Sequence, residues 1–107
     1  MIPLPTAVKV NGRVMSIKYR GAKTMPDAAG LFHPHKSLIE INKGQDLQEM
    51  RDTVLHETLH AILHTQGREY GGEDEELYVR SLATGLIGVL QDNPAFSLWL
   101  IQQTITT

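Results

Sequence analysis

The sequence predicts an α+β fold, in which a small, mostly antiparallel N-terminal sheet is followed by three helices. Short runs of alternating apolar and polar residues occupy the first 42 residues and are separated by Gly-, Pro- and Asn-containing stretches. From about residue 46 onward, apolar residues recur at helical spacing, with interruptions at 66–72 and 92–94. Strands that precede helices, rather than alternate with them, are typical of a sheet lying on one side of a helical core.

The composition indicates an ordinary globular protein. A chain of 107 residues is near the commonest domain size, so we expect one domain over residues 1–107. The net charge of −2 gives no reason to expect nucleic acid or an anionic membrane as a partner. Cysteine is absent, which excludes disulfides and thiolate zinc sites. Neither a signal peptide nor an apolar run of membrane-spanning length occurs, so we expect a cytoplasmic protein; the oligomeric state stays unknown.

The N-terminal part is predicted to form three or four strands. Residues 8–10 and 14–19 alternate in polarity on either side of an Asn-Gly pair, the favoured two-residue hairpin turn. A loop over 21–30 follows, and residues 31–32 predict the start of a short strand. Residues 37–42 predict another strand whose two isoleucines face the core.

The first helix is predicted over residues 47–66, because signals for both of its ends are present. Asp46 is a favourable N-cap, and Glu49 stands three residues later as its capping-box partner. Gly67 is the glycine expected just after the last turn. Neither Pro nor Gly interrupts the stretch between these signals.

A second helix is predicted from the acidic run 73–76, which suits the positive end of a helix, to the Asp-Asn-Pro stop at 92–94. Gly85 and Gly88 lie inside it, and close packing against the first helix is one explanation for them. Asn93 as N-cap and a following proline then predict a short last helix. Its large apolar residues are expected to complete the core, with a dimer contact as the alternative: Leu98, Trp99 and Ile101.

The predicted first helix contains a His-Glu-x-x-His motif at residues 56–60. His56 and His60 are four residues apart, so they lie on one helix face and can bind one zinc ion while leaving room for water. Glu57 lies about 100° around the helix and can act as general base toward that water. Apart from Glu57, residues 53–64 contain no charged side chain other than histidine. The motif therefore predicts a hydrolytic zinc site with one Zn²⁺.

A third metal ligand must come from outside the motif. His64 continues the four-residue spacing, but it would lie about 12 Å from His56 along a straight helix, too far to share one ion. The acidic run that opens the second helix is the better source. Glu75 lies near the centre of the apolar stripe of that helix and Glu76 at its edge. The periodicity favours Glu75 and leaves Glu76 open.

The chain also resembles a known group of proteins. Residues 53–62 match the extended zincin consensus, and residues 76–83 with the Asp-Asn-Pro at 92–94 resemble the next helix of small gluzincin-like proteins. Over residues 30–94 the chain is similar to ImmA/IrrE-type peptidases and to short zincin-like proteins encoded by phages and prophages. The resemblance implies a zincin-like fold and a zinc-dependent metallopeptidase that hydrolyses peptide bonds.

The resemblance also implies particular residues. In that group, the glutamate six residues before a Phe/Leu-Ala pair is the third zinc ligand, which selects Glu76 here and leaves Glu75 as the alternative. Four residues later the group usually has an acidic or amide side chain that steadies a zinc histidine; this chain has Arg80. An edge strand is expected to line the cleft, and residues 38–42 are the best candidate.

The predicted function is therefore cleavage of a peptide or protein substrate, with zinc activating water and Glu57 as general base. Tyr70 and Tyr78 are candidates for hydrogen bonding to the substrate oxyanion. The alternative is a catalytically weak or inactive regulator that binds a protein partner and uses zinc structurally; the small size of the chain and Arg80 favour it. A helical interaction module without metal is a third possibility.

Overall fold

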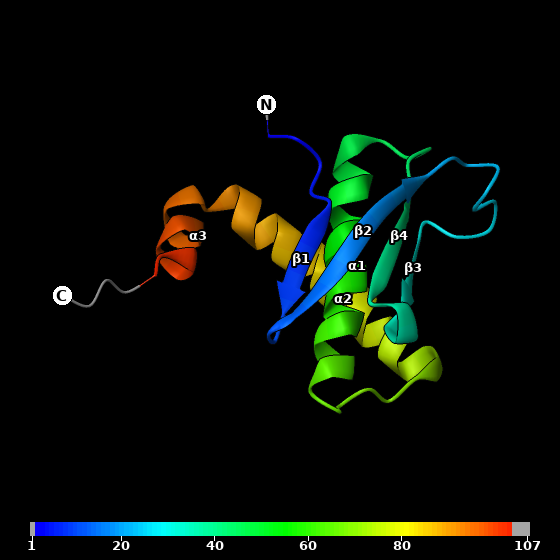
Figure 1. Ribbon diagram of the computed structural model, residues 1–107. Coiled ribbons are helices and arrows are strands. Elements are labelled where there is room, and N and C mark those ends of the chain that lie inside the picture. The colour runs from blue at the N-terminus through cyan, green and yellow to red at the C-terminus, as the bar shows by residue number, and fades with distance from the viewer. Residues whose placement is uncertain (1, 104–107) are drawn as a thin grey trace.

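The computed structural model describes residues 2–103 and has a sheet on one side of a helical core (Figure 1). The elements in chain order are β1 (Ala7–Val10), β2 (Arg13–Arg20), β3 (Gly30–His33), the 3₁₀ helix η1 (Pro34–Lys36), β4 (Leu38–Asn42), α1 (Leu47–Thr65), α2 (Gly72–Asp92) and α3 (Pro94–Ile101). The sheet lies against α1, and α2 packs on the side of α1 away from the sheet. This order of layers confirms the predicted α+β class.

The sheet has the strand order β1-β2-β4-β3. β1 and β2 pair antiparallel, as do β3 and β4, whereas β2 and β4 run parallel. Asn11 and Gly12 connect β1 to β2 with φ angles of 50° and 85°, the positive values that the predicted two-residue turn requires. The edge strands are thus β1 and β3. The prediction that residues 38–42 form an edge is wrong, because β4 is hydrogen-bonded to a strand on each side.

The core lies between the sheet and α1. Ile39 and Ile41 of β4 are completely buried, as the alternation in the sequence predicts, and Met15 of β2 lies beside them. Met50 and Ala61 of α1 cover these side chains from the helix side. The apolar face of the sheet is therefore filled by one helix, and this fixes how α1 lies across the strands.

The predicted ends of α1 are confirmed to within one residue. The Asp46 carboxylate accepts a hydrogen bond of 2.8 Å from the Glu49 backbone N–H, which satisfies one of the free donors of the first turn. After the last turn, Gly67 adopts a φ of 66°, which an L-residue with a side chain rarely adopts. Both signals act locally, so they hold whatever packs on the helix.

The glycines inside α2 have no packing role in the described structure. A Cβ built on Gly85 or Gly88 would meet no atom within 4 Å. The helix packs on α1 through other positions, including the buried Val79 and Ala83. Close approach to α1 therefore does not explain Gly85 and Gly88, and nothing in the structure explains them.

α3 extends from the end of α2, on the opposite side of the molecule from β3 (Figure 1). Its large apolar residues are exposed rather than in the core, with Trp99 70% exposed, so the core prediction for Leu98, Trp99 and Ile101 is wrong. The physical reason is that α1 already covers the apolar face of the sheet. Asn93 precedes α3 but its side chain donates to the Val89 carbonyl instead of capping α3. Of the tail that follows, residues 104–107 lie outside the described part.

Among residues 2–103, no helix combines the length and the apolar character that crossing a bilayer requires.

Candidate metal centre

Two histidines of α1 and one glutamate of α2 bring their side chains together. His56 and His60 lie one turn apart on the face of α1 that meets the first turns of α2, and their Nε2 atoms are 3.2 Å apart. The Glu76 carboxylate lies against both rings. Its Oε1 is 2.6 Å from His56 Nε2, and its Oε2 is 3.1 Å from His60 Nε2. The structure thus places the motif histidines and Glu76 in one cluster.

This cluster fits a zinc ion by the chemistry and spacing of its donors. One nitrogen or oxygen atom from each of His56, His60 and Glu76 lies within 4.8 Å of the others. Ligand atoms about 2.0–2.1 Å from a tetrahedral zinc stand roughly 3.3 Å apart, close to the observed separations of 3.1 and 3.2 Å. Two imidazoles and one carboxylate are also a donor set that catalytic zinc sites use, leaving a fourth position open.

Glu75 contacts the cluster from a different direction. Its Oε2 lies 2.6 Å from Nδ1 of His60, the ring nitrogen on the side away from Glu76. Its Oε1 accepts the backbone N–H groups of Tyr70, at 2.8 Å, and Gly71, at 3.1 Å. Burial acts to raise the pKa of Glu75, but the hydrogen bonds from Gly71, His60 and Tyr70 outweigh it, and the pKa is lowered.

Glu75 is buried, with 7% of the residue exposed. This agrees with its central position on the apolar stripe of α2. Glu76, at the edge of the stripe, is the carboxylate that faces both Nε2 atoms. Arg80 does not support a histidine; its guanidinium lies 3.7 Å from Glu76 on the same helix. The support for His60 comes from Glu75 instead, a role that spacing along the sequence did not reveal.

Glu57 lies beside the cluster and is almost completely buried. The residue is 7% exposed, and its Oε2 is 3.8 Å from His56 Nε2. Burial raises the pKa of this carboxyl to about 7; nearby His60 lowers it and Glu76 raises it further. A carboxyl group with a pKa near neutrality is suited to accept and return protons at neutral pH.

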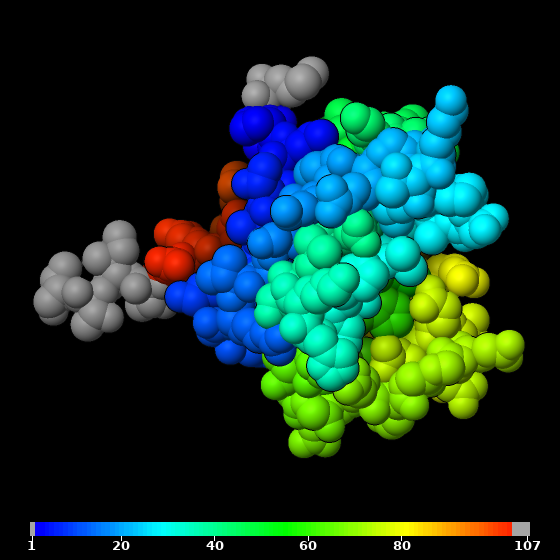
Figure 2. Space-filling model, turned by 45° about the vertical axis from the view of Figure 1, so that its right-hand side comes forward, coloured from blue at the N-terminus to red at the C-terminus, as the bar shows by residue number. Residues whose placement is uncertain are grey.

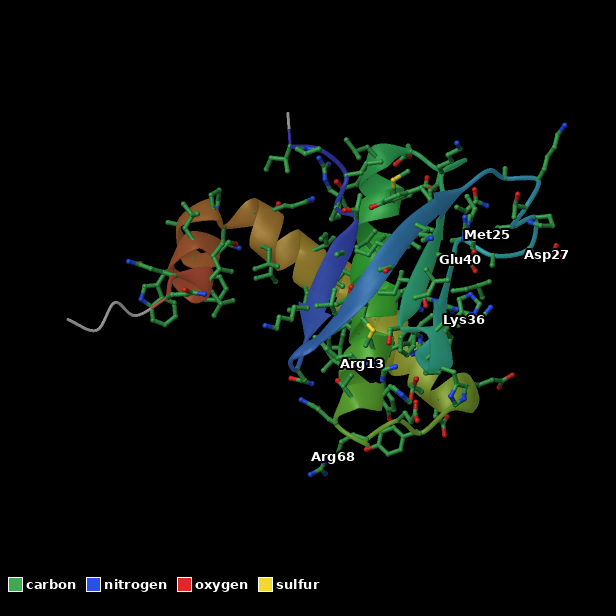
Figure 3. All side chains as sticks on the ribbon, viewed as in Figure 1. Arg13, Met25, Asp27, Lys36, Glu40 and Arg68 are labelled. Atoms are coloured by element: carbon green, nitrogen blue, oxygen red, sulfur yellow. The ribbon has the colours of Figure 1, made fainter. Side chains whose placement is uncertain are left out.

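A cleft of about 510 Å³ opens in front of these side chains. In Figure 2 it lies between the cyan segment that contains β3 and the yellow-green start of α2, with green α1 at its floor. The lining residues include His56, Glu57 and Glu76, together with Arg80 and the 27–30 segment that leads into β3. Figure 3 shows Asp27 on the outer part of that segment. The sequence predicted a loop there but did not indicate that it borders the site.

A second hollow, of about 660 Å³, lies between α1 and α2 and is mainly apolar. It is larger than the cleft, but His56, Glu57 and Glu76 do not line it, so it is not where the chemistry would occur. Tyr70 and Tyr78 line this hollow and not the cleft. The structure therefore does not bring the two tyrosines to the position that the oxyanion prediction requires.

His64 is separate from the metal centre. Its Nδ1 lies 3.0 Å from the Glu69 carboxylate, and its ring packs edge-on against Phe32 with the centroids 5.7 Å apart. This arrangement agrees with the distance argument that excluded His64 as a ligand.

Gly30 allows the start of β3 to approach α1 at the site. A Cβ at this position would lie 2.7 Å from Thr53 Cγ2 and 3.0 Å from Glu57 Cγ. Gly30 pairs with Ile41 of β4, so the backbone cannot retreat without disturbing the sheet. A side chain here would therefore push Glu57 out of its position.

We expect Gly30→Ala to lower the free energy of unfolding by about 1–3 kcal/mol, the usual cost of an overpacked contact. Gly21→Ala is the matched control, because a Cβ at Gly21 would meet no atom within 4 Å; its effect should stay within about 0.5 kcal/mol. Chemical denaturation of the metal-free proteins measures both. Equal stability of the two variants would show that β3 does not approach α1 as closely as described.

Comparison with known proteins gives one match. The model of the Peptidase_M78 family, the IrrE N-terminal-like domain, matches residues 14–88. That span runs from β2 through most of α2 and includes the His-Glu-x-x-His motif and both Glu75 and Glu76. No curated protein and no solved structure matches the chain.

Proposed function

Because the chain belongs to the Peptidase_M78 family, the IrrE N-terminal-like domain, we propose that it is a zinc-dependent metallopeptidase that hydrolyses peptide bonds. One observation above all supports this: a buried carboxyl group, Glu57, lies beside three side chains whose donor atoms suit zinc. Structural zinc sites almost always have four protein ligands, and a neighbouring base has no purpose in them. Three donors beside an open cleft are the arrangement of a catalytic site.

His56, His60 and Glu76 would hold the zinc ion. When bound, zinc supplies a Lewis acid that polarises the scissile carbonyl and lowers the pKa of water toward about 7. The carboxylate of Glu76 reduces the net charge at the site, and its partly exposed position at the cleft keeps it next to solvent.

Glu57 is the proposed general base. Its carboxyl group lines the cleft without being one of the three donors, so it is free to take a proton from the attacking water and return it to the leaving amine. Without metal, burial raises the pKa of Glu57 to about 7, and the positive charge of a bound zinc ion would favour the carboxylate form that accepts a proton.

β3 offers a place for the substrate. It is an edge strand, paired only with β4 among the described strands, and its first residue, Gly30, lies against Glu57. An extended peptide that pairs with the free edge of β3 would have its backbone directed across the cleft. Arg80 lines the same cleft, where its positive charge would favour the oxyanion that develops during hydrolysis.

The test is chelator-sensitive cleavage. The purified protein should contain one equivalent of zinc and should cut unstructured polypeptides such as casein, and a chelator should abolish cleavage until zinc is restored. If the protein binds zinc and loses stability with chelator but cuts none of a panel of unfolded substrates, the regulatory alternative with structural zinc is favoured. Absence of stoichiometric zinc after reconstitution would contradict both.

A further inference from the structure

Both carboxylate oxygens of Glu75 have hydrogen-bond partners within the protein, although Glu75 is not one of the three zinc donors. One oxygen accepts two backbone N–H groups from the segment before α2, and the other contacts His60. Glu75 therefore joins three parts of the chain: the motif helix α1, the loop after it and the first turn of α2. Such a connection would hold His60 and Glu76 in fixed relative positions, because Glu76 directly follows Glu75 in α2.

The contact with His60 also decides where the imidazole proton lies. A carboxylate only accepts hydrogen bonds, so the 2.6 Å contact requires His60 to donate from Nδ1. With Nδ1 bonded to Glu75, Nε2 is the ring nitrogen left for a metal, and it faces the Glu76 carboxylate. The ring is thus oriented before any metal arrives, with a proton held on Nδ1.

We propose that Glu75 is the positioning residue of the zinc site, which holds a proton on Nδ1 of His60 and so makes Nε2 the ligand nitrogen. The inference rests on the proposed zinc site for its purpose, although the contact with Nδ1 already exists in the metal-free protein. Within the described residues, His56 has contacts through Nε2 but no comparable acceptor at Nδ1. Of the two motif histidines, His60 is therefore the one whose ring is oriented by a carboxylate at Nδ1.

Glu75→Gln tests this role because an amide has one acceptor and one donor group. The amide oxygen would be held by the two backbone N–H groups that Glu75 now accepts, leaving the NH₂ group toward His60. An NH₂ group requires an acceptor, so Nδ1 of His60 would lose its proton and Nε2 would carry it. The variant keeps the size of the side chain and removes the proton from Nδ1.

The experiment measures the protonation of His60 Nδ1 by two-bond ¹H–¹⁵N correlation spectra of the metal-free protein. The wild type should carry a proton on Nδ1, whereas Glu75→Gln should carry one on Nε2 and none on Nδ1. Zinc affinity, measured by competition with a chromophoric chelator, should fall about 10–100-fold in Glu75→Gln. Glu73→Gln, the same change at an exposed residue of the same helical turn, is the control and should match the wild type.

Two results would overturn the proposal: a wild-type His60 with no proton on Nδ1, or a folded Glu75→Gln variant with wild-type zinc affinity. The first does not depend on whether any variant folds. A wild-type protein that shows the Nδ1–H form but binds no zinc would reject the proposed function while supporting the role of Glu75 in orienting His60. The two failures are therefore distinguishable.

Discussion

Replacing Glu57 with glutamine is expected to lower kcat by about 10²–10⁴-fold, the range that a positioned acid–base group contributes, while zinc stays bound. Glutamine has the shape of glutamate, so the close contact with Gly30 is preserved. It cannot accept a proton from water. Since Glu57 is not one of the three clustered donors, the metal content should stay at that of the wild type.

The measurement pairs steady-state cleavage with elemental analysis of the same preparation. Glu73→Gln serves as the control, because it is the same chemical substitution at an exposed residue. Glu57→Gln protein that contains zinc and still cuts at the wild-type rate would remove Glu57 from the mechanism. Loss of zinc together with activity would make Glu57 a part of the metal site instead.

His60→Ala is expected to weaken zinc binding on the order of a thousandfold. The binding free energy of zinc in small domains is about 10–16 kcal/mol, so one ligand of three would contribute roughly 4 kcal/mol. A loss of about 4 kcal/mol lowers the affinity about a thousandfold. The substitution also leaves the buried Glu75 carboxylate without its imidazole partner. We therefore expect a less stable metal-free protein as well.

Chelator competition measures the affinity, and His64→Ala is the matched control. His64 lies one turn further along α1 and bonds to Glu69 rather than to the cluster, so its loss should leave zinc affinity unchanged. An equal effect of the two substitutions would mean that zinc does not bind where the motif places it.

The parts of the fold that the sequence predicted depend on local interactions. The cap at Asp46 and the turn at Asn11-Gly12 are made by residues within a few positions of each other, and the alternation around Ile39 directly reports which face of a strand is buried. The motif histidines follow from helix geometry alone. None of these features needs knowledge of which elements are neighbours in space.

The features that the sequence did not predict depend on such neighbours. Pairing of β2 with β4 puts β3 at the edge, and no local pattern in residues 30–42 distinguishes this order from its alternative. The exposed Trp99 follows from a core that α1 had already filled. The periodicity of α2 located Glu75 correctly as buried, but it gave no information on which nitrogen of His60 the carboxylate would meet.

The most direct test is the structure of the zinc-loaded protein, with the metal located by anomalous scattering. The account predicts one ion about 2.0–2.2 Å from His56 Nε2, His60 Nε2 and a Glu76 oxygen, with the fourth position directed into the cleft beside Glu57. Coordination by Glu75 in place of Glu76, or a fourth protein side chain in the open position, would contradict it.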